Sequence, residues 1–251
     1  MEIYKPFLAN LLLLVLFGYT LSSCKNKEVE LNNTKDLFRA MKIKNDNSWY
    51  KNFTFKQHTL RFDENGQQTD STVWYESVSY PYHFRIDRDI KENIYTIYRN
   101  DSTYNFRQDT LFSKIAKPAA HLVFKGGLYF ISLEESLDKL QKYGYDTNAF
   151  RKDKFKEQAV YVIGNEKNQI WLHANNFYCM RRIYTTDDDK TVDVVYDNFK
   201  PLGQGFVEQK VTFYVEGKKR LEEFYFDIKL KNHFDAQIYD ANTNYKWYLD
   251  Y

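Results

Sequence analysis

Short runs in which apolar and polar residues alternate recur along most of this chain, and they constrain its fold more than any other feature. Successive side chains of a β-strand point to opposite faces, so such runs predict strands with one buried face. The pattern is clearest in residues 206–230, where two runs flank a turn at Glu216-Gly217-Lys218. The apolar residues that share a face are, on the first run, Val207, Val211, Phe213 and Val215, and on the second run Phe224, Phe226, Ile228 and Leu230. The residues opposite this second set are Glu223, Tyr225, Asp227 and Lys229.

About eleven such runs predict strands that follow one another along the chain. They cover residues 49–62, 69–80, 82–87, 93–99, 102–107, 158–163, 169–174, 177–185, 191–199, 206–215 and 220–230. Asn65-Gly66 between the first two is a strong hairpin signal. The runs are not separated by regular helices, so a parallel sheet is not expected.

Two helices are expected beside these strands. Asn33 or Thr34 can cap a short helix that runs through Met41. Ser132 and Glu135 form a capping box, and Gly144 can end the helix that it starts. The predicted fold is therefore α+β and mainly antiparallel β. It is a single curved sheet or unclosed barrel of about eleven strands with helices covering the concave side, and a closed barrel or a sandwich is the alternative.

Composition supports a folded β-protein and excludes some partners. Hydrophobic residues make up 43% of the chain and aromatic residues 18%, which favours strands around a substantial core. The formal net charge is only +2 and opposite charges are interspersed, so we expect no nucleic-acid partner. The chain has 2 cysteines, Cys24 and Cys179. Cys179 lies in a strand-like run, where a buried inert thiol is favoured over a reactive one.

The N-terminus has the layout of a secretory signal. Lys5 precedes a mostly apolar run over residues 7–17, which is shorter than the about 20 residues that a membrane-spanning helix needs. Leu21-Ser22-Ser23-Cys24 follows and closely resembles the cleavage box of bacterial lipoproteins. This resemblance implies a signal peptide at residues 1–23, cleavage before Cys24, and acylation of Cys24 with chains such as palmitate. An ordinary signal peptide with a coincidental cysteine is the alternative. Several acyl chains would hold the protein firmly on a membrane.

Signatures of catalysis and metal binding are missing from the sequence. The five histidines show no metal-ligand spacing, and no Gly-x-Ser-x-Gly elbow occurs. Asp187-Asp188-Asp189 lacks the spacing and glycine of a calcium loop. We therefore expect a protein that is not an enzyme and that has no cofactor, no metal and no catalytic residues.

The order of elements resembles the LolA/LolB-type lipoprotein carriers and the wider group of outer-membrane lipoprotein-sorting proteins. A short helix leads into Phe53-Thr54-Phe55, and a hairpin brings in Val73-Trp74-Tyr75-Glu76. Tyr80-Pro81-Tyr82-His83-Phe84-Arg85-Ile86 resembles the family's Pro-x-x-Phe-Arg segment. A helical insertion and a final long hairpin complete the likeness, which covers most of residues 34–240. It implies a tether at residues 24–33 and one LolA/LolB-like domain at residues 34–251.

The family fold implies an apolar cavity between sheet and helices that receives acyl chains. The candidate cavity residues are Phe53, Phe55, Trp74, Phe84, Arg85, Phe224 and Phe226. Arg85 matches the family arginine that helps to hold the lid helices, and the aromatic residues lie on predicted strands. The alternatives are plain core packing for the aromatic residues and a surface or strand-edge ion pair for Arg85.

The resulting functional prediction is a membrane-anchored lipoprotein that binds lipid or lipoprotein acyl chains, in outer-membrane lipoprotein sorting or envelope lipid handling. A non-enzymatic scaffold or interaction subunit of an envelope complex is the alternative. By the same resemblance, Lys25 after the cysteine argues against retention in the inner membrane. We expect a lipid-anchored protein of the outer membrane that faces the periplasm.

Overall fold

The computed structural model describes residues 30–45, 48–99, 101–116, 120–243 and 245–250. The chain divides into the units Met1–Leu31 and Asn32–Tyr251, and every helix and strand below belongs to the second unit. The helices are α2 (Thr34–Asn45), α3 (Ala120–Lys125) and α4 (Leu133–Lys142), with short 3-10 turns η1 (Gly127–Tyr129), η2 (Ala236–Tyr239) and η3 (Trp247–Asp250). None of the described helices is long and apolar enough to cross a membrane.

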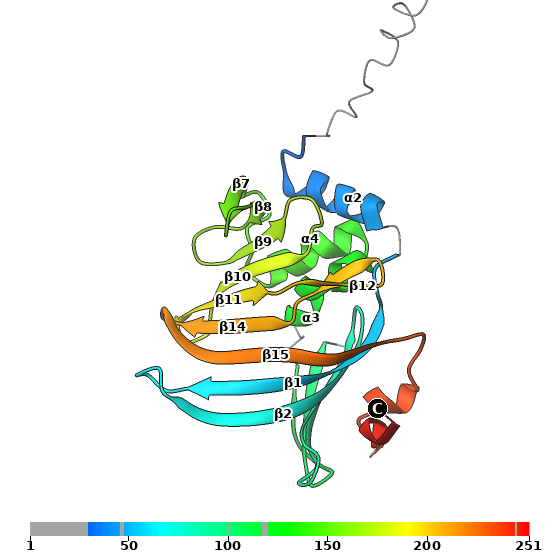
Figure 1. Cartoon of the computed structure of the whole chain (residues 1–251). Coiled ribbons are helices and arrows are strands. Elements are labelled where there is room, and N and C mark those ends of the chain that lie inside the picture. The colour runs from blue at the N-terminus through cyan, green and yellow to red at the C-terminus, as the bar shows by residue number, and fades with distance from the viewer. Residues whose placement is uncertain (1–29, 46–47, 100, 117–119, 244, 251) are drawn as a thin grey trace, which may run out of the picture. The chain divides into compact units, whose positions relative to one another are not determined.

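Thirteen strands form one antiparallel sheet in the order β6-β5-β4-β3-β2-β1-β15-β14-β11-β10-β9-β8-β7. The strands are β1 (Asn52–Phe62), β2 (Gln68–Ser79), β3 (His83–Asp89), β4 (Ile94–Arg99), β5 (Ser102–Arg107), β6 (Thr110–Ile115), β7 (Phe150–Phe155), β8 (Gln158–Ile163), β9 (Gln169–His173), β10 (Cys179–Thr185), β11 (Thr191–Asp197), β14 (Lys210–Val215) and β15 (Lys218–Lys231). β12 (Lys200–Leu202) and β13 (Gly205–Val207) form a separate hairpin. The sheet is strongly curved and does not close, and the three helices lie together against one side of it (Figure 1).

This architecture confirms the predicted fold class, with thirteen strands in the sheet where about eleven are expected. The strands that the pattern missed are the two edges, β6 and β7. Both carry charged side chains and neither buries a face: β7 reads Phe-Arg-Lys-Asp-Lys-Phe and is exposed over its four central residues. Charged edge strands block pairing with other chains, and they lack the apolar alternation that reveals an inner strand.

The two predicted helices begin where their caps indicate. Asn33 accepts a hydrogen bond from the backbone N–H of Asp36 at 2.8 Å, and α2 follows. Ser132 accepts one from the backbone N–H of Glu135 at 3.0 Å, and α4 follows. Gly144, just beyond α4, has φ of +80°, the left-handed conformation that glycine adopts freely.

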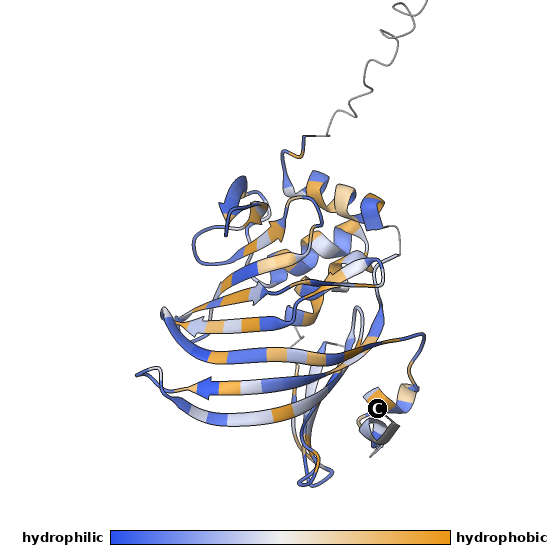
Figure 2. Ribbon diagram, in the orientation of Figure 1, coloured by the Kyte–Doolittle hydropathy of each residue, from blue (hydrophilic) through white to orange (hydrophobic). Residues whose placement is uncertain are grey.

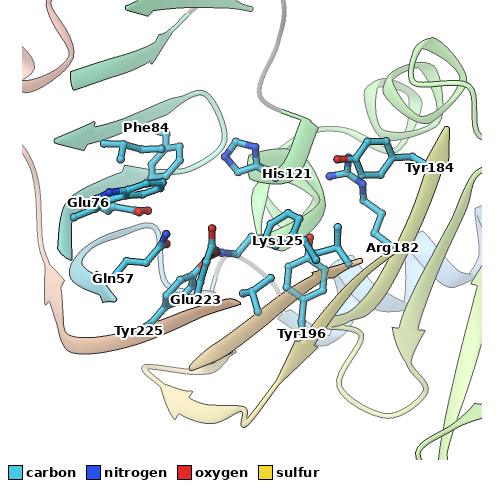
Figure 3. A pocket seen from close by; sticks show the side chains of 15 residues that line it. Gln57, Glu76, Phe84, His121, Lys125, Arg182, Tyr184, Tyr196, Glu223 and Tyr225 are labelled. Atoms are coloured by element: carbon cyan, nitrogen blue, oxygen red, sulfur yellow. Dashed lines mark hydrogen bonds between the residues drawn. The ribbon is translucent and has the colours of Figure 1, made fainter. Parts of the chain in front are cut away.

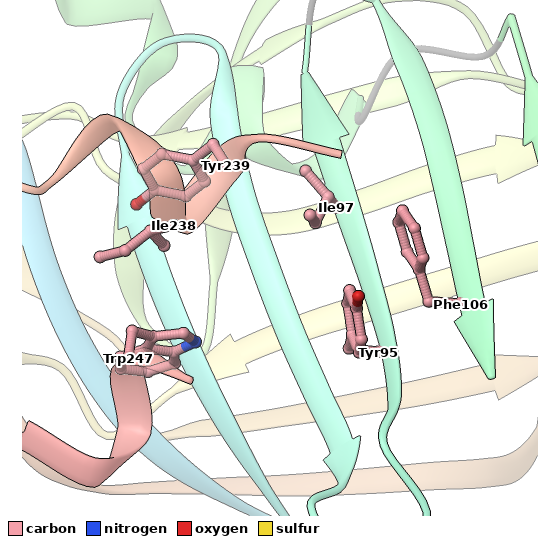
Figure 4. Close-up of a cluster of buried hydrophobic side chains, with 6 residues drawn as sticks. All are labelled: Tyr95, Ile97, Phe106, Ile238, Tyr239 and Trp247. Carbon is pink, nitrogen blue, oxygen red and sulfur yellow. The ribbon is translucent and has the colours of Figure 1, made fainter. Parts of the chain in front are cut away.

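The C-terminal segment packs on the face of β3–β5 that points away from α3. Its residues Ile238, Tyr239 and Trp247 form a buried cluster with Tyr95, Ile97 and Phe106 (Figure 4). The sheet is thus covered on both faces here, although alternation predicts a single apolar face. Hydropathy along the ribbon shows the same mixture, with no strand uniformly apolar (Figure 2).

Candidate functional site

A cavity of about 180 Å³ lies between the inner face of the sheet and α3. Side chains from β1, β2, β3, β10, β11, β14 and β15 form its walls, and His121 and Lys125 of α3 complete the lining (Figure 3). Its lining residues are Gln57, Trp74, Glu76, Phe84, Ile86, His121, Lys125, Arg182, Tyr184, Val194, Tyr196, Val211, Phe213, Glu223 and Tyr225.

Strand register brings these residues together. Tyr225 of β15 lies opposite Gln57 of β1, and Gln57 lies opposite Trp74 of β2. On the other side, Val194 of β11 lies between Arg182 of β10 and Phe213 of β14. Because side chains directly opposite each other share a face, each of these rows presents its side chains to the cavity.

The predicted site residues fall into three groups. Trp74 and Phe84 line the cavity. Phe53 and Phe55 are buried beside it: the ring centroid of Phe55 lies 4.5 Å from that of Tyr225, and Phe53 packs edge-on against Tyr50 at 5.0 Å. These two fill the core rather than the cavity wall.

Phe224 and Phe226 lie on the opposite face of β15. Phe224 is half-buried under Lys210, whose Nζ lies 5.4 Å from the ring centroid, and Phe226 is 42% exposed. The face that alternation assigns to the interior is therefore the outer one at Phe224 and Phe226. Glu223 and Tyr225 point inward instead, because they lie opposite the buried Thr59 and Gln57 of β1. A register shift between Thr54 and Lys56 of β1 exchanges the faces of β15 beyond this point, so Leu230 lies opposite the buried Phe53.

Arg85 is fully buried, but it faces the C-terminal segment. Its guanidinium donates to the Asp87 carboxylate, with Nη2 2.9 Å from Oδ1, and to the carbonyl oxygen of Ile238 at 3.2 Å. It also lies 4.4 Å from the ring centroid of Tyr95. Trp247 completes the group by donating from Nε1 to Asp87 at 2.7 Å. The described hydrogen bonds of Arg85 thus hold the C-terminal segment. The family resemblance instead implies that this arginine holds the lid helices, and the alternative expectation is an ion pair at the surface or at a strand edge.

Two buried carboxyl groups line one wall of the cavity. Burial raises the pKa of Glu76 well above its usual value, and the nearby Glu223 raises it further. Burial also raises the pKa of Glu223 to about 7, although Lys125 and a hydrogen bond from the Tyr225 hydroxyl oppose the rise. Near neutral pH Glu223 is therefore close to its midpoint.

The basic groups of the cavity come from α3 and β10. Lys125 pairs with the buried carboxylate of Glu208 and donates to the Tyr225 hydroxyl at 3.0 Å. His121 packs edge-on against Phe84, with ring centroids 5.3 Å apart, and burial lowers its pKa to about 3. The imidazole is therefore neutral at physiological pH.

Arg182 stands on the opposite wall. Its guanidinium lies over the ring of Tyr184, 4.2 Å from the centroid, and 5.3 Å from that of Phe124. It forms no ion pair with any carboxylate in the described part of the chain. Its Nε is buried without a hydrogen-bond partner.

The sequence offers little signal for these polar residues. Glu223 reads as the solvent face of an alternating strand, and Lys125 and Arg182 read as ordinary surface charges. Only the pairing of the strands and the position of α3 show that they share a cavity. No cluster of three or more His, Cys, Asp or Glu residues suited to a metal ion occurs among the residues that the structure describes. Cys179 is buried and free, and burial raises its pKa to about 12, which makes the thiol unreactive.

Comparison with known proteins identifies the fold. No protein-family profile and no curated protein matches the sequence. Among solved structures, a LolA superfamily protein from Nitrosomonas europaea superposes with a TM-score of 0.56 and 10% identity, over 85% of this chain and 100% of the other. A putative outer membrane lipoprotein-sorting protein domain from Vibrio parahaemolyticus gives 0.58 and 10%, over 84% and 97%. A DUF1329 family protein from Desulfovibrio piger gives 0.59 and 8%, over 84% and 99%.

The chain therefore has the fold of LolA superfamily and lipoprotein-sorting structures, an unclosed antiparallel sheet with helices on one side. The predicted resemblance is confirmed at the level of fold. Sequence identity of this size carries no statement about what the chain binds.

Proposed function

We propose that this protein is a membrane-anchored lipoprotein whose cavity takes up acyl chains of lipids or lipoproteins, in outer-membrane lipoprotein sorting or envelope lipid handling. The observation that carries the proposal is the cavity between the curved sheet and α3, on a fold shared with lipoprotein-sorting structures. The anchor would be Cys24, which lies outside the described residues, and the protein would face the periplasm. A carrier of this kind needs no catalytic residues and no cofactor.

The apolar part of the cavity suits an acyl chain. Trp74, Phe84, Val194 and Phe213 contribute wall surface without charge. Each Å² of chain that leaves water contributes roughly 25 cal/mol, so such a wall needs no further chemistry to bind an alkyl group.

Cavity size indicates how binding would proceed. The volume of about 180 Å³ is below the roughly 300–1,000 Å³ of typical ligand pockets. A whole acyl chain would therefore require α3 to move away from the sheet. The contacts that oppose this movement are those of His121 with Phe84 and of Lys125 with Glu208.

The proposal is tested by native mass spectrometry of the purified protein after removal of bound lipid, with acyl ligands added back. Val194→Phe narrows the cavity and should weaken acyl binding about tenfold or more, since the added ring occupies ligand space. Val195→Phe is the matched control, because Val195 points to a groove on the outer face. Failure of the wild-type protein to bind any acyl ligand would count against the proposal, as would equal effects of the two variants.

The small volume and the charged residues of the cavity favour one alternative. A scaffold or interaction subunit of an envelope complex would use the same fold with its interior filled by side chains. In that case cross-linking in intact cells should capture a stable protein partner, and Val194→Phe should leave that partner in place.

A further inference from the structure

Arg182 is the cation of the cavity that no described carboxylate neutralises. It lines the cavity and its residue is 8% exposed, so its charge is largely removed from solvent. Lys125, the other cation of the lining, pairs with Glu208. The buried Arg85 on the outer side of β3 pairs with Asp87. An arginine side chain stays protonated at all physiological pH values, so the charge of Arg182 cannot be lost by titration.

A buried guanidinium without an anion is costly, and natural proteins almost always pair one. Here the neighbours are aromatic and uncharged: the guanidinium lies 4.2 Å from the ring centroid of Tyr184 and 5.3 Å from that of Phe124, and the Tyr145 hydroxyl is a further polar neighbour. They leave Nε without a partner. The planar N–H donors of arginine match a carboxylate or a phosphate, which can accept two parallel hydrogen bonds.

The surroundings of Arg182 define the rest of such a ligand. Val194 lies directly opposite it on β11, and Phe213 follows on β14, so an apolar wall continues from the cation into the cavity. The acidic residues Glu76 and Glu223 stand on the far wall, on β2 and β15 (Figure 3). A molecule with an anionic end and an alkyl chain fits this arrangement, with its anion at Arg182.

We propose that Arg182 binds the anionic end of an acyl ligand, so that the cavity selects alkyl chains that carry a carboxylate or a phosphate over uncharged ones. This inference rests on the proposed function and names the ligand class for it. A free fatty acid supplies the carboxylate, and a phospholipid or lysophospholipid supplies the phosphate. The raised pKa of Glu76 is consistent with the selection, because it lessens the negative charge of the far wall and so its repulsion of an anion.

The test compares three probes that share one chain: dodecanoate, dodecyl phosphate and dodecanol. Their binding to the purified full-length protein, freed of lipid, is measured by calorimetry below the aggregation concentration of each probe. The wild-type protein should bind at least one of the two anions about tenfold or more tightly than the alcohol, as expected for a charge-assisted hydrogen bond. Preference for the carboxylate points to fatty acids, and preference for the phosphate points to phospholipids.

Variants separate charge recognition from packing. Arg182→Gln should remove the preference while the alcohol binds as before, and Arg182→Lys should keep part of it. Arg181→Gln is the matched control, because Arg181 is the adjacent residue on the outer face, where its Nη2 pairs with Asp193 at 2.7 Å. This control should keep the wild-type preference.

Equal affinity of the wild-type protein for the alcohol and both anions would overturn the inference and leave the proposed function standing. Absence of binding for all three probes would overturn both. The wild-type comparison decides the matter even if Arg182→Gln does not fold. A preference that survives in a folded Arg182→Gln protein would also overturn the inference.

Discussion

Ionisable side chains in the interior give this protein its most distinctive residue-level chemistry. Glu76 and Glu223 occupy one wall of the cavity, and Arg182 occupies the other. Burial of such groups favours their uncharged forms, and a carboxyl group responds by a rise in its pKa. The pH dependence of stability should therefore report on these carboxyl groups.

Glu223→Gln should stabilise the protein increasingly as pH rises. The pKa of Glu223 is raised, chiefly by burial, to about 7, whereas an unfolded glutamate titrates near about 4.3. Between these values the folded protein holds the proton and the unfolded chain has lost it, so wild-type stability falls with rising pH. Removing the group abolishes that loss, which is at most roughly 4 kcal/mol once pH exceeds the folded pKa.

Urea unfolding of both proteins across this pH range measures the effect. Glu222→Gln is the control: Glu222 is the preceding residue on the other face of β15, and it pairs with Lys210 at 2.8 Å. Its loss should bring no gain in stability above neutral pH. A constant difference between Glu223→Gln and the wild type at all pH values would contradict the expectation.

At the scale of elements, the C-terminal segment acts as a second cover for the sheet. η2 and η3 bury the outer face of β3–β5, while α3 lies over the inner face. The position of α3 depends on close packing at its end, because a Cβ on Gly126 would lie 2.3 Å from a ring atom of Tyr80. Both covers therefore rest on specific side-chain contacts rather than on long helices.

Trp247→Ala should detach the C-terminal cover. The change removes a buried indole and its hydrogen bond to Asp87, which together correspond to a loss of about 3–5 kcal/mol in unfolding free energy. Hydrogen exchange should then speed up in β4, where Ile97 and Tyr95 lose their covering residues.

Trp247→Phe is the conservative comparison, since it keeps most of the ring and loses the hydrogen bond, with a cost of about 1–3 kcal/mol. Phe112→Ala, at a side chain that is 63% exposed, should change stability by less than about 0.5 kcal/mol. An alanine variant of Trp247 as stable as the Phe112 variant would show that the segment contributes nothing to the fold.

On the scale of the whole molecule, the sheet is long enough to curve around a cavity but does not close. β6 and β7 remain its edges, so the interior is bounded by side chains from seven inner strands together with α3. In a closed barrel, by contrast, each strand pairs on both sides and no edge remains.

Cys24→Ser tests the anchor predicted for the whole protein. If Cys24 carries acyl chains, the serine variant should move from the membrane fraction to the soluble fraction, because the described helices include no membrane span to hold it. Immunoblots of separated fractions measure the shift. Cys179→Ser is the control, since Cys179 is buried. The Cys179→Ser protein should stay with the membranes. Unchanged membrane association of the Cys24 variant would exclude an acyl anchor at this residue.

Much of the fold could be read from local pattern. Alternation identified the inner strands, Asn65-Gly66 marked the first hairpin, and Asn33 and Ser132 marked the helix starts. These signals are local because they depend on the hydrogen bonding and side-chain direction of neighbouring residues. The edge strands escaped because an edge strand has no buried face to produce a pattern.

The site could be read only in part. Trp74 and Phe84 line the cavity, whereas Phe224 and Phe226 lie on the outer face and Arg85 holds the C-terminal segment. Alternation shows that a strand has two unlike faces, yet it does not state which face the rest of the chain will cover.

Period-two alternation and turn chemistry act between neighbouring residues, so the amino-acid sequence alone specifies the antiparallel architecture. Which face of each strand turns inward, and which charges meet inside, is settled only when the chain folds. That choice depends on register between strands far apart in the chain and on the C-terminal segment that covers the outer face of β3–β5. Arg182 illustrates this difference. The sequence shows that the residue is an arginine, but only the folded sheet shows that no described carboxylate pairs with it.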